Sequence, residues 1–220
     1  MKTQNPQRIR QYIVFLAGLF FMGLGIALVT KSNLGTSPIS SVPYVLSMTL
    51  PISMGTLIFL LCTLFFFIEL MIVGKKFPKK QYLQLLVGPI FGVFIDLGMA
   101  IFSFLDPSLY FVKIVELVIG CILLALGIYL QIAANTILNP GEGVVKVIAD
   151  KVGKEFGNVK MMFDGTLVLV ALMVSFVAFG SIEGLGEGTI ISAFLVGFFV
   201  KLISRIGNKI VYKNKLENAA

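Results

Sequence analysis

The chain has 220 residues, of which 57% are hydrophobic and 13% are charged, and this balance excludes an ordinary soluble domain. Its net charge of +7 does not indicate a nucleic-acid partner, because the basic residues lie in short segments between long apolar runs, as they do in membrane proteins. We therefore expect one all-α, polytopic membrane domain over residues 1–220, with the lipid bilayer as its partner.

The first half of the chain contains three apolar runs of spanning length, at residues 12–30, 54–74 and 82–104. Between the first two, residues 31–53 are too short and too interrupted by Pro38, Pro43 and Pro51 to span. Residues 38–50 are expected to form a short helix, because Ser37 is a good N-cap and Pro38 suits the first helical position.

The second half has the same order, with apolar runs at residues 111–132, 160–179 and 189–206. Asn139 and Pro140 have the cap-then-proline order of Ser37 and Pro38, so a second short helix is predicted at residues 140–152. This segment is also amphipathic, which suits a helix lying flat on the inner membrane surface. Re-entrant and interfacial positions both stay open at this point.

Basic residues assign the two sides of the membrane. Lys75, Lys76, Lys79 and Lys80 mark the loop after the second span as cytoplasmic, and the basic residues from Lys201 onward place the C-terminus on the same side. The loops at residues 106–108 and 181–188 lack basic residues and are predicted to lie outside. The expected topology has six transmembrane helices with both termini in the cytoplasm.

The two halves resemble each other. A shift of 102 residues superposes Gly25 on Gly127, Asn33 on Asn135, Pro38 on Pro140 and Gly55 on Gly157, and a shift of 105 superposes residues 91–97 on 196–202. The alternative is a chance match in a chain rich in Gly, Val, Ile and Leu. Three spans per repeat is an odd number, so the second copy must insert upside down. This predicts an inverted repeat of residues 11–104 and 111–207.

Short helices that begin inside a membrane protein point free amide hydrogens and positive dipole ends into it. We therefore expect the helix starts at Ser37 and Asn139 to approach a shared cavity that binds a polar or anionic group. The predicted substrate-binding residues lie near these starts: Asn33, Ser37, Ser40, Ser41, Asn135, Asn139, Gly141, Glu142 and Gly143.

Ionisable residues inside spans are costly and usually face a cavity or a partner. Asp96 lies deepest and is predicted to couple binding to a proton or a cation, with Asp164 as a second candidate. The alternatives are structural ion pairs, of Asp96 with Lys201 and of Asp164 with Lys160, which lies on the same helix face.

The remaining reactive residues give little chemistry. The chain has no histidine, which excludes Ser–His catalysis, histidine proton relays and most transition-metal sites. Cys62 and Cys121 lack the paired spacing of a disulfide framework or a zinc site. Glu69 and Glu116 lie near span ends and are expected at the membrane interface. No cofactor and no metal are expected.

Four segments resemble the YczE/YyaS/YitT-type family of bacterial integral membrane proteins: LGTSPISS at 34–41, NPGEG at 139–143, KMMFD at 160–164 and EGTI at 187–190. The similarity extends from about residue 12 to residue 205. It implies a protein of the bacterial cytoplasmic membrane, and a role in small-molecule export or in support of secondary metabolism.

The function expected from these patterns is a secondary transporter, or exporter, of a small polar or anionic molecule, in which one repeat rocks against the other. No enzyme is expected: Asp96 and Asp164 on different spans resemble an aspartyl protease dyad, but the Phe-Asp-Gly-Thr sequence around Asp164 is not the Gly-x-Gly-Asp context of that chemistry. The alternative function is a non-transporting membrane scaffold or regulator. Assembly as a homo-oligomer stays open.

Overall fold

The part of the chain that the computed structural model describes, residues 6–217, folds into eight α-helices. They are α1 (Pro6–Lys31), α2 (Pro38–Thr49), α3 (Met54–Val73), α4 (Gln84–Ile101), α5 (Tyr110–Ala134), α6 (Pro140–Val152), α7 (Phe156–Phe179) and α8 (Glu187–Glu217). Two 3₁₀ turns, Gly74–Lys76 and Lys79–Leu83, join α3 to α4. The prediction of an all-α fold is confirmed.

Six of these helices are long and apolar enough to span a membrane, as the six apolar runs predict. The other two, α2 and α6, have 12 and 13 residues and are too short. α7 begins before residue 160 and α8 continues beyond residue 206. Helical hydrogen bonding does not require apolar side chains, so a helix can extend past the apolar run that reveals it.

The predicted starts of the two short helices are confirmed. Pro38 and Pro140 are the first residues of α2 and α6, and Ser37 and Asn139 precede them with extended backbones, at ψ angles of 152° and 140°. The Asn139 side chain accepts a hydrogen bond from the Gly141 amide at 3.4 Å. Proline fits the first position because its missing amide hydrogen would have no partner within the helix.

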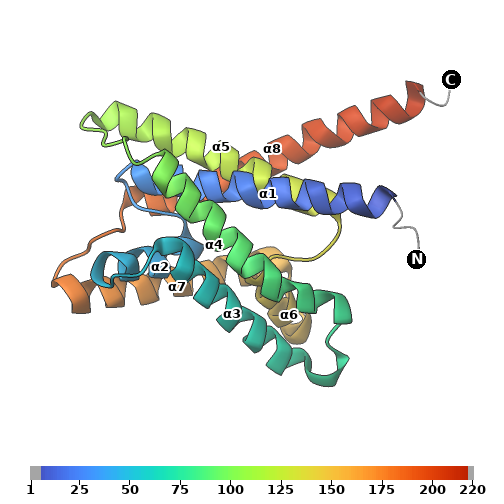
Figure 1. The fold of residues 1–220 in the computed structure, drawn as a ribbon, viewed down its shortest axis with the longest axis horizontal. Helices are drawn as coiled ribbons and strands as arrows, with labels where there is room; N and C mark the ends of the chain where they lie inside the picture. The colour runs from blue at the N-terminus through green and yellow to red at the C-terminus, as the bar shows by residue number, and fades with distance from the viewer. Residues whose placement is uncertain (1–5, 218–220) are drawn as a thin grey trace.

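Figure 1 shows the helices in two groups. In the upper group, α1 lies along α5, and α8 packs on α5. In the lower group, α2 packs on α7, and α3 packs on α6. α4 packs on both α1 and α3 and so connects the two groups along one flank.

α1 and α5 approach each other through glycines. A Cβ atom on Gly18 would lie 2.8 Å from the Gly127 carbonyl oxygen, and one on Gly25 would lie 2.8 Å from the Gly120 carbonyl oxygen. The crossings leave no room for side chains, so the backbones are in direct contact, as is common between membrane helices. The order of the two pairs shows that α1 and α5 are antiparallel.

Gly25→Ala is expected to destabilise the protein, because the new Cβ atom would lie 2.5 Å from the backbone nitrogen of Leu124. Overpacking of this kind costs about 1–3 kcal/mol of unfolding free energy. The measurement is the unfolding temperature in lipid nanodiscs. Gly165→Ala on α7 is the control, since no heavy atom lies within 4 Å of that position. Equal losses in the two variants would contradict the close contact.

Candidate functional site

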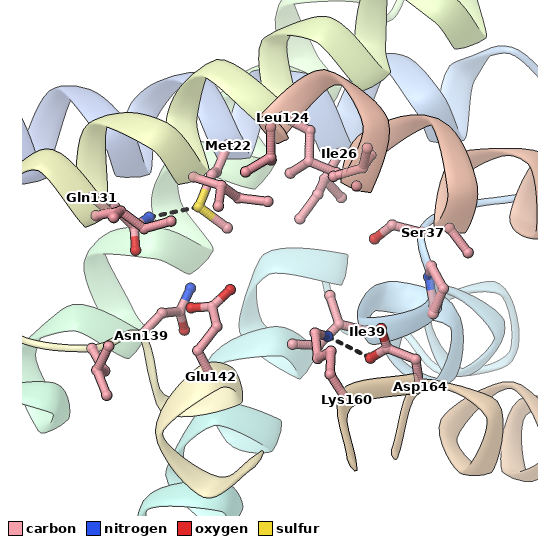
Figure 2. Close-up of a pocket in the computed structure, with 18 of the residues that line it drawn as sticks. Met22, Ile26, Ser37, Ile39, Leu124, Gln131, Asn139, Glu142, Lys160 and Asp164 are labelled. Carbon is pink, nitrogen blue, oxygen red and sulfur yellow. Dashed lines mark hydrogen bonds and ion pairs between the residues drawn. The ribbon is translucent and has the colours of Figure 1, made fainter. Parts of the chain in front are cut away.

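A cavity of about 480 Å³ lies between the upper and lower groups of helices. The upper wall is mainly apolar, with Met22 and Ile26 from α1 and Leu124 from α5, and α4 adds Phe91. Figure 2 shows the apolar side chains of α1 and α5 above the open space. This volume suits a small molecule.

Polar side chains gather on the opposite wall, which α6 and α7 form. Asn139 and Glu142 come from the start of α6, and Lys160 and Asp164 from the first turns of α7. Lys160 and Asp164 form an ion pair, as their spacing predicts. Lys146 of α6 also lines the cavity. One wall is therefore mainly apolar and carries no charged side chain, and the other carries two acidic and two basic side chains.

The starts of α2 and α6 meet at this cavity. Ser37 and Asn139 both line it and are 3% and 2% exposed. Between them, Ile39 of α2 lies against Gly141 of α6. The last residues of both short helices are exposed, so each runs from the interior of the bundle to its surface. This arrangement favours the re-entrant position over the interfacial one.

Among the side chains that the structure describes, Glu142 is the cavity carboxylate without an ion-pair partner. Burial raises the pKa of Glu142 above its ordinary value of 4.5, the nearby Lys160 ammonium lowers it, and Asp164 raises it; the net shift is upward. Glu142 therefore keeps its proton at a higher pH than an exposed glutamate does.

Among the residues that the structure describes, no group of three or more His, Cys, Asp or Glu side chains is placed to hold a metal ion.

Ser40 and Ser41 are fully buried, but they form hydrogen bonds within and around α2 instead of facing the cavity. The Ser40 hydroxyl is 2.6 Å from that of Ser37 and 2.8 Å from that of Thr36. The Ser41 hydroxyl donates to the Pro38 carbonyl oxygen at 2.6 Å. Both serines thus stabilise the first turn of α2 and its approach to the cavity.

Asn33 and Asn135 lie outside the cavity, in the turns that follow α1 and α5. Both have left-handed backbones, with φ angles of 55° and 48°, and no other described residue except glycine has a positive φ. Asparagine tolerates this conformation better than most residues. Both residues therefore lie in helix-ending turns, and neither lines the cavity.

The glycines of the NPGEG motif are buried against neighbouring helices. Gly141 faces Ile39, and a Cβ atom on Gly143 would lie 2.5 Å from a carboxylate oxygen of Glu69 on α3. These positions let α6 pack closely and leave Glu142, between them, to face the cavity.

Asp96 also lies outside the cavity. Its carboxylate accepts hydrogen bonds from the Ser53 hydroxyl at 2.6 Å and the Gly55 amide at 2.7 Å, so it stabilises the first turn of α3. Within residues 6–217 no ion pair joins it to Lys201. The structure separates Asp96 from Asp164, which faces the cavity.

Glu69 and Glu116 are 3% and 9% exposed, so both side chains are buried among the helices, and their interfacial depth stays a prediction. α6 packs on α3 and covers Glu69, and the sequence does not show this contact. The Glu69 carboxylate lies close to the side-chain amide of Gln84, a residue of α4 that is 1% exposed.

Gln131 of α5 and Ser192 of α8 also line the cavity, and sequence reasoning missed both. The Gln131 amide donates to the Met22 sulfur, and the Ser192 hydroxyl donates to the Thr189 carbonyl oxygen at 3.0 Å. The signal available in the sequence was a polar side chain within an apolar span, which generally faces the protein interior.

Glu142→Gln is expected to change how stability depends on pH. The folded protein holds a proton at Glu142 more tightly than the unfolded chain does, so the free energy of unfolding falls as pH rises from 4.5 through the raised pKa. The variant lacks this fall and should be more stable than the wild type above that pKa. The measurement is the unfolding temperature in nanodiscs from acidic to mildly alkaline pH.

Asp150→Asn is the matched control, because Asp150 is exposed on the same helix. Its pH profile should follow that of the wild type. Parallel profiles for the wild type and Glu142→Gln would contradict the raised pKa of Glu142.

Comparison with known proteins identifies relatives. The chain is 26% identical over 206 residues to the "Uncharacterized membrane protein YczE" of Bacillus subtilis (strain 168), and the alignment covers 90% of this chain and 86% of that protein. No solved structure matches the chain significantly. The pattern of the "Family of unknown function (DUF6198)" matches residues 9–205. The resemblance to YczE is thus confirmed, and the chain is a multi-pass membrane protein that belongs to the DUF6198 family.

Proposed function

We propose that the protein is a secondary transporter of the bacterial cytoplasmic membrane, and that its substrate is a small molecule with a polar or anionic group. The observation that carries the proposal is the cavity at which the starts of α2 and α6 meet. Buried helix starts that face a cavity are typical substrate sites of transporters built from inverted repeats.

The packing of the helices supports an inverted repeat. If α1 to α4 correspond to α5 to α8, contacts in one half should have counterparts in the other; α3 with α4 is the exception, because α7 and α8 have no comparable interface. α1 with α4 corresponds to α5 with α8, α2 with α3 to α6 with α7, and α2 with α7 to α6 with α3, and all of these pairs pack. Such reciprocal contacts are expected of a pseudo-two-fold axis.

Individual residues give the same support. Under the shift of 102 residues, Gly18 corresponds to Gly120 and Gly25 to Gly127, so the two glycine contacts between α1 and α5 are counterparts of each other. Asn33 and Asn135 correspond and share the left-handed conformation. Ile39 corresponds to Gly141, which it contacts. A chance match of sequence would not predict these reciprocal contacts.

We assign the cavity residues roles in transport from their charge and their hydrogen-bonding groups. The first amides of α6 and the Asn139 side chain are placed to bind a polar or anionic group, with Lys160 nearby. Glu142, with its raised pKa and no ion-pair partner among the described residues, is the carboxylate we assign to proton coupling, with the Asp164 and Lys160 pair beside it. The Asp96 carboxylate accepts its hydrogen bonds from residues at the start of α3, so we assign Asp96 a role in stability and none in coupling. An aspartyl protease would need both aspartates at one site.

An inverted repeat of three spans each puts both termini on one side of the membrane, and the basic loops assign that side to the cytoplasm, with the α4–α5 and α7–α8 loops outside. In a variant lacking Cys62 and Cys121, cysteines replacing the exposed residues Ser108 and Glu183 should react with an impermeant thiol reagent added to whole cells. A cysteine replacing Lys79 should react only after the cells are opened. Labelling of Lys79→Cys in intact cells would refute this topology.

Transport is tested by uptake into proteoliposomes across a panel of small metabolites, with and without a pH gradient. Uptake of at least one compound should depend on the gradient, and Glu142→Gln should lose this dependence while still inserting and folding. Asn139→Ala should weaken binding, seen as a raised KM. Asp150→Asn should behave as the wild type.

Absence of gradient-driven uptake for the whole panel, by protein that is shown to be folded, would contradict the proposal. The alternative of a non-transporting scaffold or regulator would then be preferred.

A further inference from the structure

The two flanks of the cavity differ. α4 packs on both α1 and α3 and closes one flank, whereas its counterpart α8 packs on α5 but has no comparable interface with α7. In Figure 1, α7 and α8 diverge from the connection that joins them, one in the lower and one in the upper group. Over the most apolar 18 residues of each helix, 39% of the α4 residues but 6% of the α8 residues are buried. The flank between α7 and α8 is therefore open.

The residues that close the first flank have counterparts on the second. Gly55 of α3 and Gly92 of α4 are in contact, since a Cβ atom on Gly92 would collide with the Gly55 carbonyl oxygen. Their counterparts are Gly157 of α7 and Gly197 of α8, and no heavy atom lies within 4 Å of a Cβ atom at either position. The glycines that permit close packing are present on both helices, but the helices are apart.

A polar pair accompanies each glycine pair. Beside Gly55 and Gly92, the Asp96 carboxylate of α4 accepts a hydrogen bond from the Ser53 hydroxyl at the start of α3. The counterparts of Asp96 and Ser53 are Lys201 of α8 and Glu155, the N-cap of α7. Both are exposed, and neither forms an ion pair with a side chain that the structure describes. In the first pair the donor lies at the start of α3 and the acceptor on α4. In the second pair the donor, Lys201, lies on α8 and the acceptor, Glu155, lies at the start of α7, and these two side chains carry opposite charges.

The open flank lies beside the cavity, because both of its helices line the cavity. α8 contributes Ser192, Val196 and Gly197 to the lining, and α7 contributes Lys160 and Asp164. Gly197 thus lines the cavity and is also the counterpart of Gly92, the residue through which α4 contacts α3.

We infer that the gap between α7 and α8 is a lateral gate, through which an amphipathic molecule enters the cavity from the bilayer. The gate closes when Gly157 packs on Gly197 and Lys201 pairs with Glu155. This inference rests on the proposed function and narrows its substrate. The apolar wall suits an apolar body, and a wall with two acidic and two basic side chains suits a zwitterionic head group.

Closure is tested by a disulfide in a variant lacking Cys62 and Cys121. Cysteines replacing Gly157 and Gly197 should form a disulfide under mild oxidation in nanodiscs, because closure brings their Cα atoms into the bonding range of about 4–7 Å. The control pairs Gly165→Cys with Gly197→Cys; position 165 is equally open but lies about 12 Å farther along α7, so this pair should not react. Failure of the first pair to react, or equal reaction of both, would overturn the closing contact.

The ion pair is tested in the same assay. Lys201→Glu should slow disulfide formation, because it places two acidic side chains together in the closed state. The added change Glu155→Lys should restore the rate. Unchanged rates in Lys201→Glu, or no rescue by the second change, would overturn the pairing of Lys201 with Glu155.

Entry is tested with an alkylphosphocholine that carries a photoreactive diazirine in its chain, dissolved in the nanodisc lipid. In the reduced Gly157→Cys and Gly197→Cys protein it should label the cavity residues Ser192 and Val196, and oxidation should abolish this labelling. Labelling of the lipid-exposed residues Phe194 and Phe198 should continue. Cavity labelling that survives oxidation would overturn the lateral route.

These outcomes are separate from those of the uptake experiment. If the disulfide forms and abolishes cavity labelling but proteoliposomes show no flux, the gate stands and the transport function fails. If flux is present but the disulfide leaves both flux and labelling unchanged, transport stands and the gate fails.

Discussion

The structure depends on how two helices can begin inside a membrane protein. The first turn of a helix has amide hydrogens without partners in the helix, and a lipid environment offers them none. Here α2 and α6 both begin with a cap and a proline, which removes one free amide from each and satisfies another at Asn139. The remaining polar groups require a lined interior space, and the cavity between the two groups of helices provides it.

The long helices are arranged so that this interior can exist. α1 and α5 cross with their backbones in contact at two glycine pairs, whereas α2 and α6 pack on α7 and α3 in the other group of helices. α4 then connects the upper and lower groups, and its junction with α3 relies on the glycine pair and on the Asp96 cap. One side of the molecule is thus held by backbone contacts and hydrogen bonds, and the other is held mainly by the packing of α8 on α5.

The sequence predicts the helices well because length and hydropathy decide whether a segment can span, and because Ser-Pro and Asn-Pro mark helix starts by local chemistry. It predicts the cavity residues Ser37, Asn139 and Glu142 for the same local reason. The sequence fails to predict the role of a side chain where a contact with another helix decides that role. The depth of Asp96 is visible in the sequence, but its hydrogen bonds to Ser53 and Gly55 arise from packing between helices. Asn33 and Asn135 suggested polar ligands, whereas their backbone conformation places them in turns.

The balance of charges in the cavity has an electrical consequence. Glu142, Asp164, Lys146 and Lys160 sum to zero when all are ionised, so uptake of a proton by Glu142 makes the group positive. A positive charge that moves across a membrane responds to the voltage by about 2.3 kcal/mol per 100 mV. If the polar wall changes the side of the membrane to which it is open, the protonated and unprotonated forms experience different forces. The membrane potential would then determine the direction of net movement as much as the proton concentration does, through a single side chain at the start of α6.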